Sequence, residues 1–120
     1  MINIKPLKAY TDNYIWLLET NEEVSVVDPG DAKPVLDYLS KTNKNLRDIF
    51  ITHHHFDHTA GVPELENIIS GSIYGPKNSY ELINEKVTQG DTLSSLGIKF
   101  EIIEVPGHTL DHIAFYNEEN

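Results

Sequence analysis

The histidines of this chain are confined to two short segments, and each segment follows an apolar run typical of a buried strand. Residues 52–58 read Thr-His-His-His-Phe-Asp-His, and residues 107–112 contain His108 and His112. The run Ile-Phe-Ile at 49–51, just before the first segment, is suited to a buried and parallel strand. The sequence therefore predicts a sheet with metal-ligating residue types where its strands end.

The rest of the apolar pattern alternates between strand-like and helix-like segments. Residues 20–23 predict the turn of a hairpin between two β-rich runs. The predicted strands cover residues 14–18, 24–27, 49–51, 72–74, 91–96, 99–105 and 113–116. This order indicates an α/β fold, layered as in α+β proteins, with a mixed sheet.

Two helices are predicted, and a third segment is ambiguous. Asp31 is a predicted N-cap for a helix that ends near residues 43–45. Its buried face is expected to carry Val35, Leu36 and Leu39. A second helix is expected to place these residues on its buried face: Val62, Leu65, Ile68 and Ile69. Residues 78–85 predict one or two helical turns.

Alternation along an extended backbone decides which histidines of the first segment can act together. His53 and His55 are two residues apart and point the same way, so both can bind one metal ion. His54 and Phe56 should then face away. Structural histidines or an expression tag are the alternatives, but tags are terminal and lack an embedded aspartate. Burying several imidazoles together without a metal would also be costly, and this favours a metal site.

The residues after this extended stretch can reach a second ion. Once the chain turns, Asp57 and His58 are released from the alternation. Imidazole and carboxylate ligands together suit zinc, iron or manganese. His108 also follows an apolar strand, although residues 106–107 (Pro-Gly) could simply form a turn. For His112, a supporting or structural role is favoured over direct ligation.

Composition limits the classes of partner. The chain of 120 residues has a formal net charge of -10, which disfavours nucleic acid and anionic membrane surfaces as partners. It has no cysteine, which excludes disulfides, thiolate metal ligands and a cysteine nucleophile. No signal peptide or membrane span is recognisable, so we expect a cytoplasmic location. Residues 1–120 are expected to form one domain.

Residues 52–58 contain the pattern Thr-His-x-His-x-Asp-His, and on this pattern the chain resembles the metallo-β-lactamase superfamily. Other segments narrow the resemblance to the N-terminal part of the glyoxalase II (hydroxyacylglutathione hydrolase) family. These segments are DNYIWLL at 12–18, VDPG at 27–30, YGP at 74–76 and PGHTLDHI at 106–113. The resemblance implies one half of an αββα sandwich, with helices on one face of a mixed sheet.

Carried over residue by residue, the resemblance implies a metal-dependent enzyme. His53, His55 and His108 would bind the first metal, and Asp57 and His58 the second, with Asp57 also counted as catalytic. The family binds two zinc ions, and iron or manganese are alternatives. The implied reaction is hydrolysis of the thioester S-lactoylglutathione by a metal-bound hydroxide. The resemblance assigns no substrate-binding residue to this chain.

Two further positions have supporting roles or purely local ones. The resemblance implies that Asp28 either lies behind the metal ligands and orients them or is structural at the end of its strand, and for His112 a supporting or structural role is expected. For Asp28, an ordinary Asp-Pro-Gly turn is the alternative. The family usually has glycine where this chain has Asp111, and aspartate is among the residues that best tolerate positive φ.

The family continues beyond the matched segments, with a metal-bridging aspartate, a last histidine ligand and the glutathione-binding residues. We therefore expect a truncated domain that binds one metal ion, or two weakly, and that could be inactive alone. Its sheet is expected to leave one apolar face bare, which a homodimer would cover. Alternative functions are another enzyme of this fold (thioesterase, lactonase or sulfur dioxygenase) and a non-catalytic domain that binds metal or self-associates.

Overall fold

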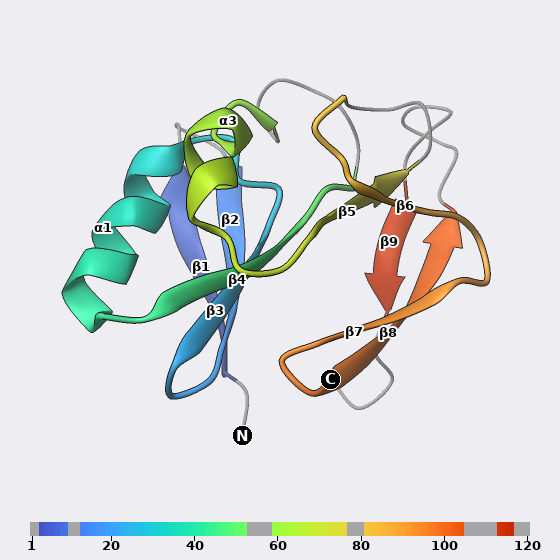
Figure 1. Cartoon of the computed structure of the whole chain (residues 1–120), viewed down its shortest axis with the longest axis horizontal. Coiled ribbons are helices and arrows are strands. Elements are labelled where there is room, and N and C mark those ends of the chain that lie inside the picture. Colours follow the sequence, from blue (N-terminus) through green and yellow to red (C-terminus); the bar gives the residue numbers. More distant parts are fainter. Residues whose placement is uncertain (1–2, 10–12, 53–58, 77–80, 105–112, 117–120) are drawn as a thin grey trace.

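A computed structural model describes residues 3–9, 13–52, 59–76, 81–104 and 113–116 (Figure 1). The strands are β1 (Asn3–Ala9), β2 (Asn13–Glu19), β3 (Glu23–Val27), β4 (Asn45–Phe50), β5 (Ile73–Pro76), β6 (Glu85–Val87), β7 (Thr92–Ser95), β8 (Ile98–Glu104) and β9 (Ile113–Tyr116). The helical segments are α1 (Ala32–Thr42), α3 (Val62–Leu65) and the 3-10 turn η1 (Glu66–Ile68). Within these described ranges, no helix is long and apolar enough to cross a membrane.

The strands form two sheets. The larger sheet has the order β1-β2-β3-β4-β5-β6, and the smaller has the order β7-β8-β9. Strands β1, β2 and β3 pair antiparallel, as the predicted hairpin requires, whereas β3, β4, β5 and β6 pair parallel. The smaller sheet is antiparallel throughout. The predicted mixed sheet, with a parallel strand over residues 49–51, is confirmed.

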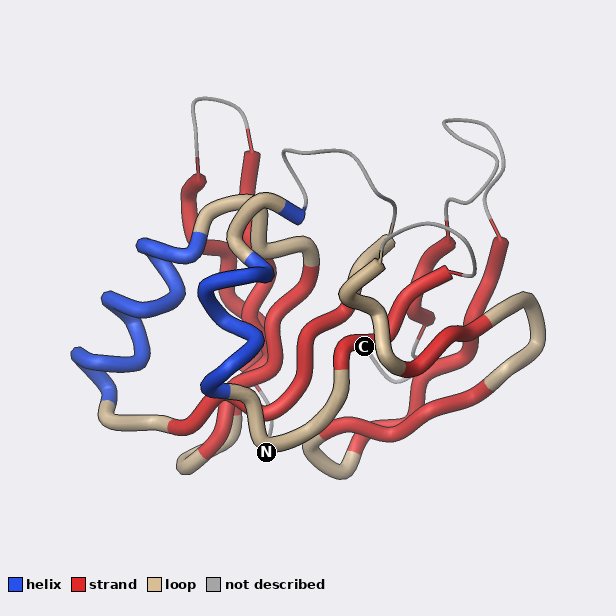
Figure 2. Tube along the Cα trace, turned by 45° about the horizontal axis from the view of Figure 1, so that its top comes forward, coloured by secondary structure: helices blue, strands red, loops and turns tan. Residues whose placement is uncertain are grey.

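The helical segments cover one face of the larger sheet, and the smaller sheet lies on its other side (Figures 1 and 2). Ala32 and Val35 of α1 and Val62 and Leu65 of α3 are buried in the core on the helical side. Their partners come from β2, β3, β4 and β5: Ile15, Leu17, Val24, Val26, Leu46, Ile49 and Ile73. This core holds the helices against the sheet.

Helix α1 has the boundaries that its sequence predicts. The side chain of Asp31 accepts a hydrogen bond from the N–H of Lys33 at 3.1 Å, and Asn43 ends the helix with a φ of 60°. Leu36 was expected on the buried face, but that prediction is wrong, because the residue is 37% exposed. Leu36 lies about 100° around the helix from Val35, at the rim of the contact.

Two other predictions of helix are also wrong in part. The second helix consists of one α-turn followed by η1, and Ile68 is 47% exposed rather than buried. Residues 81–84 form turns and bends, and Glu85 begins β6, so the described part of the segment 78–85 contains no helix. The short β6 buries only Val87 and therefore has no clear alternation.

The smaller sheet packs on the face of the larger sheet that the helices leave open. Leu18, Phe50 and Phe100 form the buried part of this contact, with Tyr74 and Phe115 packed against them. The expectation of one bare sheet face is therefore wrong for β4 and β5. It was wrong because β7, β8 and β9 pair among themselves and cover this face.

Part of the same face remains exposed on β1 and β2. Trp16 is two residues from Leu18 on β2, and Ile4 of β1 pairs with Leu18, so all three lie on one face. Ile4 is 48% exposed and Trp16 is 47% exposed. The smaller sheet thus covers Leu18 but not its apolar neighbours at the β1 side.

Candidate functional site

The structure places the surroundings of the candidate site. The predicted ligands lie outside the described residues: His53, His55, Asp57, His58 and His108, together with His54 and His112. Among the described residues, no group of three or more histidines, aspartates and glutamates could hold a metal ion. The described part of the site is the set of strand ends from which residues 53–58 and 105–112 continue.

Asp28 is the predicted site residue that the structure describes. It directly follows β3, is 8% exposed, and has a positive φ of 50°. Its N–H donates to the carbonyl of Phe50 at 2.8 Å, which joins the ends of β3 and β4. Its carboxylate accepts hydrogen bonds from the N–H of Thr52 at 2.7 Å and from the Thr52 hydroxyl at 2.6 Å. Asp28 therefore fixes the residue that immediately precedes the first histidine segment.

The chain beyond the first histidine segment is held by Pro29, which follows Asp28 in the same turn. The N–H of Gly61 donates to the carbonyl of Pro29 at 2.9 Å. A Cβ at Gly61 would lie 2.5 Å from this carbonyl oxygen and 2.6 Å from the nitrogen of Ala32. Only glycine permits this close approach. Asp28 therefore holds Thr52 before residues 53–58, and Pro29 holds Gly61 after them.

Apolar packing relates the two histidine segments to each other. The rings of Phe50 and Phe115 are in edge contact, with their centroids 5.0 Å apart. Phe50 precedes His53 by three positions, and Phe115 follows His112 by three positions. Three extended residues span about 10 Å. The end of β4, which precedes the first segment, and strand β9, which follows the second, are therefore in contact.

Strand pairing bounds the second segment as well. Glu104, the last residue of β8, pairs with Ile113, the first residue of β9. Residues 105–112 therefore connect two adjacent antiparallel strands, and both of these strands pack against Phe50 through Phe100 and Phe115. The donor chemistry of both segments, imidazole with carboxylate, suits a divalent transition metal.

Tyr74 borders this apolar contact from β5. Its ring stacks on that of Phe50 at a centroid distance of 5.5 Å. Burial raises the pKa of the Tyr74 hydroxyl above its usual value, and the negative charge of Asp48 raises it further. Tyr74 therefore keeps its proton at neutral pH.

Sequence reasoning gave no role to Thr52, Pro29 or Gly61. Their contacts join residues that are far apart in the chain, and local patterns do not report such pairs. One signal was available: an Asp-Pro-Gly turn follows one parallel strand, and a threonine follows the next. Parallel neighbours end at the same sheet edge, so these residues had to lie close together.

Comparison with known proteins matches residues 11–120 to the family model of the metallo-beta-lactamase superfamily. The chain is 49% identical to a hydroxyacylglutathione hydrolase of Pseudoalteromonas translucida over 99% of its own length and 48% of that protein. It is 47% identical to a hydroxyacylglutathione hydrolase of Chromohalobacter salexigens, over 97% of this chain and 47% of that protein. The chain therefore spans about half the length of these curated relatives.

Solved structures share the same fold. The BLEG-1 B3 metallo-beta-lactamase superposes with a TM-score of 0.85 at 18% identity, covering 98% of this chain and 68% of that one. ETHE1 from Myxococcus xanthus superposes with a TM-score of 0.77 at 24% identity, covering 98% of this chain and 54% of that one. At these identities, the likeness concerns the arrangement of sheets and helices.

Proposed function

The chain belongs to the metallo-beta-lactamase superfamily, and on that premise we propose that it is the metal-binding part of a hydroxyacylglutathione hydrolase. The reaction is hydrolysis of the thioester bond of S-lactoylglutathione. The observation that carries the proposal is the 49% identity to such a hydrolase over 99% of this chain. The anchoring of both ends of residues 53–58 by Asp28 and Pro29 agrees with it.

In the proposed site, His53, His55 and His108 hold one zinc ion, while Asp57 and His58 contribute to a second. A zinc ion held by these residues would supply a coordinated water with its pKa lowered towards about 7, and a Lewis acid for a thioester carbonyl. Iron and manganese are the alternative metals for the same donors.

Asp28 has a positioning role in this proposal. Its carboxylate holds both the N–H and the hydroxyl of Thr52, so the chain enters residues 53–58 in one fixed direction. His112 is proposed to support the second segment in a similar way. Ligand orientation of this kind typically changes metal affinity by about 10- to 100-fold.

The test compares neighbouring histidines. We expect the purified chain to contain zinc by elemental analysis, and His53→Ala and His55→Ala to lose it. His54→Ala is the matched control, because alternation along an extended chain predicts that this residue faces away from the proposed ligands, and the variant should keep its zinc. Equal metal content in all three variants would refute the site.

Turnover is measured separately on S-lactoylglutathione with added zinc. Zinc-dependent hydrolysis that disappears in His53→Ala supports the hydrolase. Zinc binding without turnover would instead indicate a metal-binding domain that does not act on this thioester by itself. Iron in place of zinc would favour a dioxygenase of the same fold.

We also propose that two copies of this chain associate through the exposed part of the sheet face. Ile4 and Trp16 are about half exposed there, and both are large apolar side chains. The partner that we propose is a second copy of this chain, and the proposed location is the cytoplasm. Each copy carries a net charge of -10, so the repulsion between copies makes their association depend on salt concentration. Sedimentation equilibrium in moderate salt should give twice 13.6 kDa, whereas 13.6 kDa for the folded chain would refute the dimer.

A further inference from the structure

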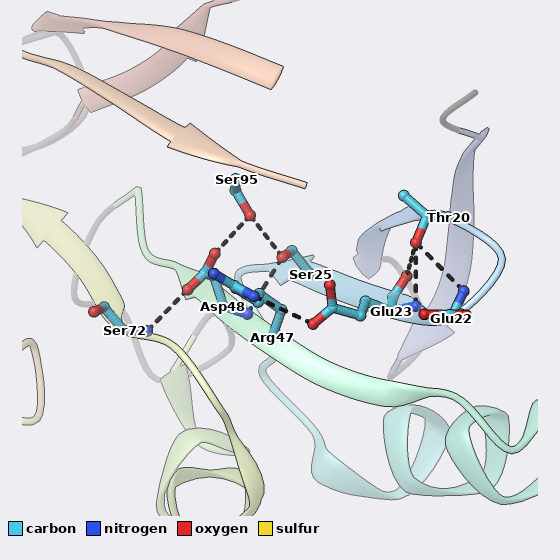
Figure 3. Close-up of polar contacts among 8 residues, drawn as sticks. All are labelled: Thr20, Glu22, Glu23, Ser25, Arg47, Asp48, Ser72 and Ser95. Carbon is cyan, nitrogen blue, oxygen red and sulfur yellow. Dashed lines mark hydrogen bonds and ion pairs between the residues drawn. The ribbon is translucent and has the colours of Figure 1, made fainter. Parts of the chain in front are cut away.

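A ring of buried polar side chains joins the two sheets. Ser25 of β3 is fully buried, and Asp48 of β4 and Ser95 of β7 are 3% and 4% exposed. Figure 3 shows the three side chains pointing toward one another between the strands. The hydroxyl of Ser95 donates to the Asp48 carboxylate at 2.6 Å, and the hydroxyl oxygens of Ser25 and Ser95 are 2.8 Å apart.

The direction of each hydrogen bond follows from the donors available. The hydrogen of Ser95 is used on Asp48, so the Ser25 hydroxyl donates to Ser95. The backbone N–H of Asp48 donates to the Ser25 hydroxyl oxygen at 3.3 Å, which closes the ring. The other carboxylate oxygen of Asp48 accepts from the N–H of Ser72 at 2.8 Å. The buried carboxylate is therefore bonded at both oxygens, which offsets its desolvation.

The ring fixes one sheet against the other in a way that the apolar contacts cannot. Packing of Phe50 on Phe100 and Phe115 is strong but non-directional, and it tolerates sliding. The hydrogen bond that Ser95 donates to Asp48 and the one that it accepts from Ser25 together specify a single register. Ser95 ends β7, and the turn after it leads into β8 at Ile98.

From this ring, β4 and β8 run in the same general direction. Phe50 lies two residues beyond Asp48 on β4, and Phe100 lies two residues beyond Ile98 on β8. The centroids of the Phe50 and Phe100 rings are 5.6 Å apart. Residues 53–58 follow β4 in the chain, and residues 105–112 follow β8. Each proposed ligand segment is therefore carried by a strand that is held at the ring.

We propose that the ring of Ser25, Asp48 and Ser95 is a positioning element for the metal site, because it aligns the strands that carry the two histidine segments. This inference rests on the proposed function. The seven residues of β8 span about 20 Å, so a tilt of about 5° at the ring moves the far end by roughly 2 Å. Metal–ligand distances tolerate only about 0.2 Å.

The main test separates positioning from plain stabilisation. Ser95→Ala removes the hydroxyl that links the two sheets. Asp48→Asn keeps the side-chain volume but replaces the carboxylate that accepts the Ser95 hydrogen bond with an amide. Val35→Ala is the matched control, because it weakens the core under α1 without touching the ring. Zinc affinity is measured by competition with a chromophoric chelator, at a temperature where circular dichroism shows every variant folded.

We expect Ser95→Ala and Asp48→Asn to weaken zinc binding by 10-fold or more, and Val35→Ala to leave it within about twofold. Equal affinity in the folded ring variants and the control would overturn the proposal. If His53→Ala binds zinc like the wild type, the proposed function fails instead, and this outcome is distinct.

A second measurement does not depend on metal. Nuclear Overhauser contacts between the rings of Phe50 and Phe115 report the alignment of β4 with β9. These contacts should weaken or change in Ser95→Ala and persist in Val35→Ala. Unchanged contacts in folded Ser95→Ala would show that the ring does not set the register of the sheets, whatever the metal data show.

Discussion

The carboxylate of Asp28 accepts two hydrogen bonds from one residue, Thr52, through both its backbone N–H and its hydroxyl. Asp28 directly follows β3, and Thr52 lies just beyond the end of the neighbouring parallel strand β4 and directly precedes His53. A charged acceptor with two donors at 2.7 and 2.6 Å is a strong and directional contact. It makes the turn that follows β3 part of the support for the candidate metal site.

Asp28→Ala should therefore lower zinc affinity by roughly 10- to 100-fold, since Thr52 would lose its fixed orientation. The free energy of unfolding should fall by about 1–3 kcal/mol, because the N–H of Thr52 loses its acceptor. A zinc competition titration and urea denaturation measure the two effects. Asp31→Ala is the control: it removes a helix cap at about 1 kcal/mol and should leave zinc affinity unchanged. Unaltered zinc affinity in Asp28→Ala would contradict this role.

Removing metal should destabilise the folded chain. At a free zinc concentration of about 100 times Kd, binding adds roughly 2.7 kcal/mol to the free energy of unfolding, and the melting temperature should rise by roughly 10 °C. Calorimetry with zinc and then with excess chelator measures this change. His54→Ala should respond like the wild type, and His53→Ala should not respond. A melting temperature that ignores saturating zinc would count against the metal site.

Gly61→Ala should cost about 1–3 kcal/mol of stability, because the added Cβ meets the carbonyl of Pro29 and the backbone of Ala32. Gly90→Ala is an informative control, since nothing lies within 4 Å of its Cβ position and only its φ of 89° opposes a side chain. That conformational cost is about 1 kcal/mol. Only Gly61→Ala should also weaken zinc binding, as measured by chelator competition. Equal zinc affinity in both variants would mean that the contact with Pro29 is not needed by the site.

Lys44→Ala should destabilise the chain by about 1–3 kcal/mol. Glu19 of β2 is 1% exposed, and its carboxylate accepts from Lys44 Nζ at 2.8 Å and from the hydroxyl of Tyr38. Loss of Lys44 leaves a buried charge with less compensation, although Tyr38 remains. Lys33→Ala is the control, because its ion pair with Asp37 is exposed and should contribute little. Urea denaturation that gives equal losses for both lysines would contradict this difference.

Tyr74 should titrate above the ordinary tyrosine pKa of 10.0, because burial and then the charge of Asp48 oppose the phenolate. The folded chain therefore holds this proton more tightly than the unfolded chain. The stabilising contribution is complete below the unfolded pKa of about 10 and is lost as pH rises above it. The difference in tyrosinate absorbance between wild type and Tyr74→Phe reports this group, and Asp48→Asn should lower its midpoint. A wild-type midpoint at or below 10.0 would oppose the assignment.

The elements that the sequence predicted well are those with local signals. Asp31 begins α1 through a hydrogen bond two residues away, and the β2–β3 hairpin turns at Thr20, whose hydroxyl accepts from the N–H of Glu23 at 3.1 Å. The strand at residues 49–51 was recognisable because both of its faces are buried, so it reads as an unbroken apolar run.

The features that the sequence did not predict depend on distant partners. Nothing near Asp48 in the sequence signals its hydrogen bonds with Ser25, 23 positions away, and Ser95, 47 positions away. Leu36 and Ile68 had helical spacing, but their exposure is decided by how wide a face the sheet offers to each helix. The proposed ligands in residues 53–58 and 105–112 stay predictions.

Trp16 is the only tryptophan in the sequence, and it stands half exposed beside the buried Leu18. Its intrinsic fluorescence is therefore a built-in optical reporter of that face. Indole emission moves to shorter wavelength when water is displaced, so whatever docks over β1 and β2 should produce a blue shift. The chain can thus be titrated against candidate binders without any label.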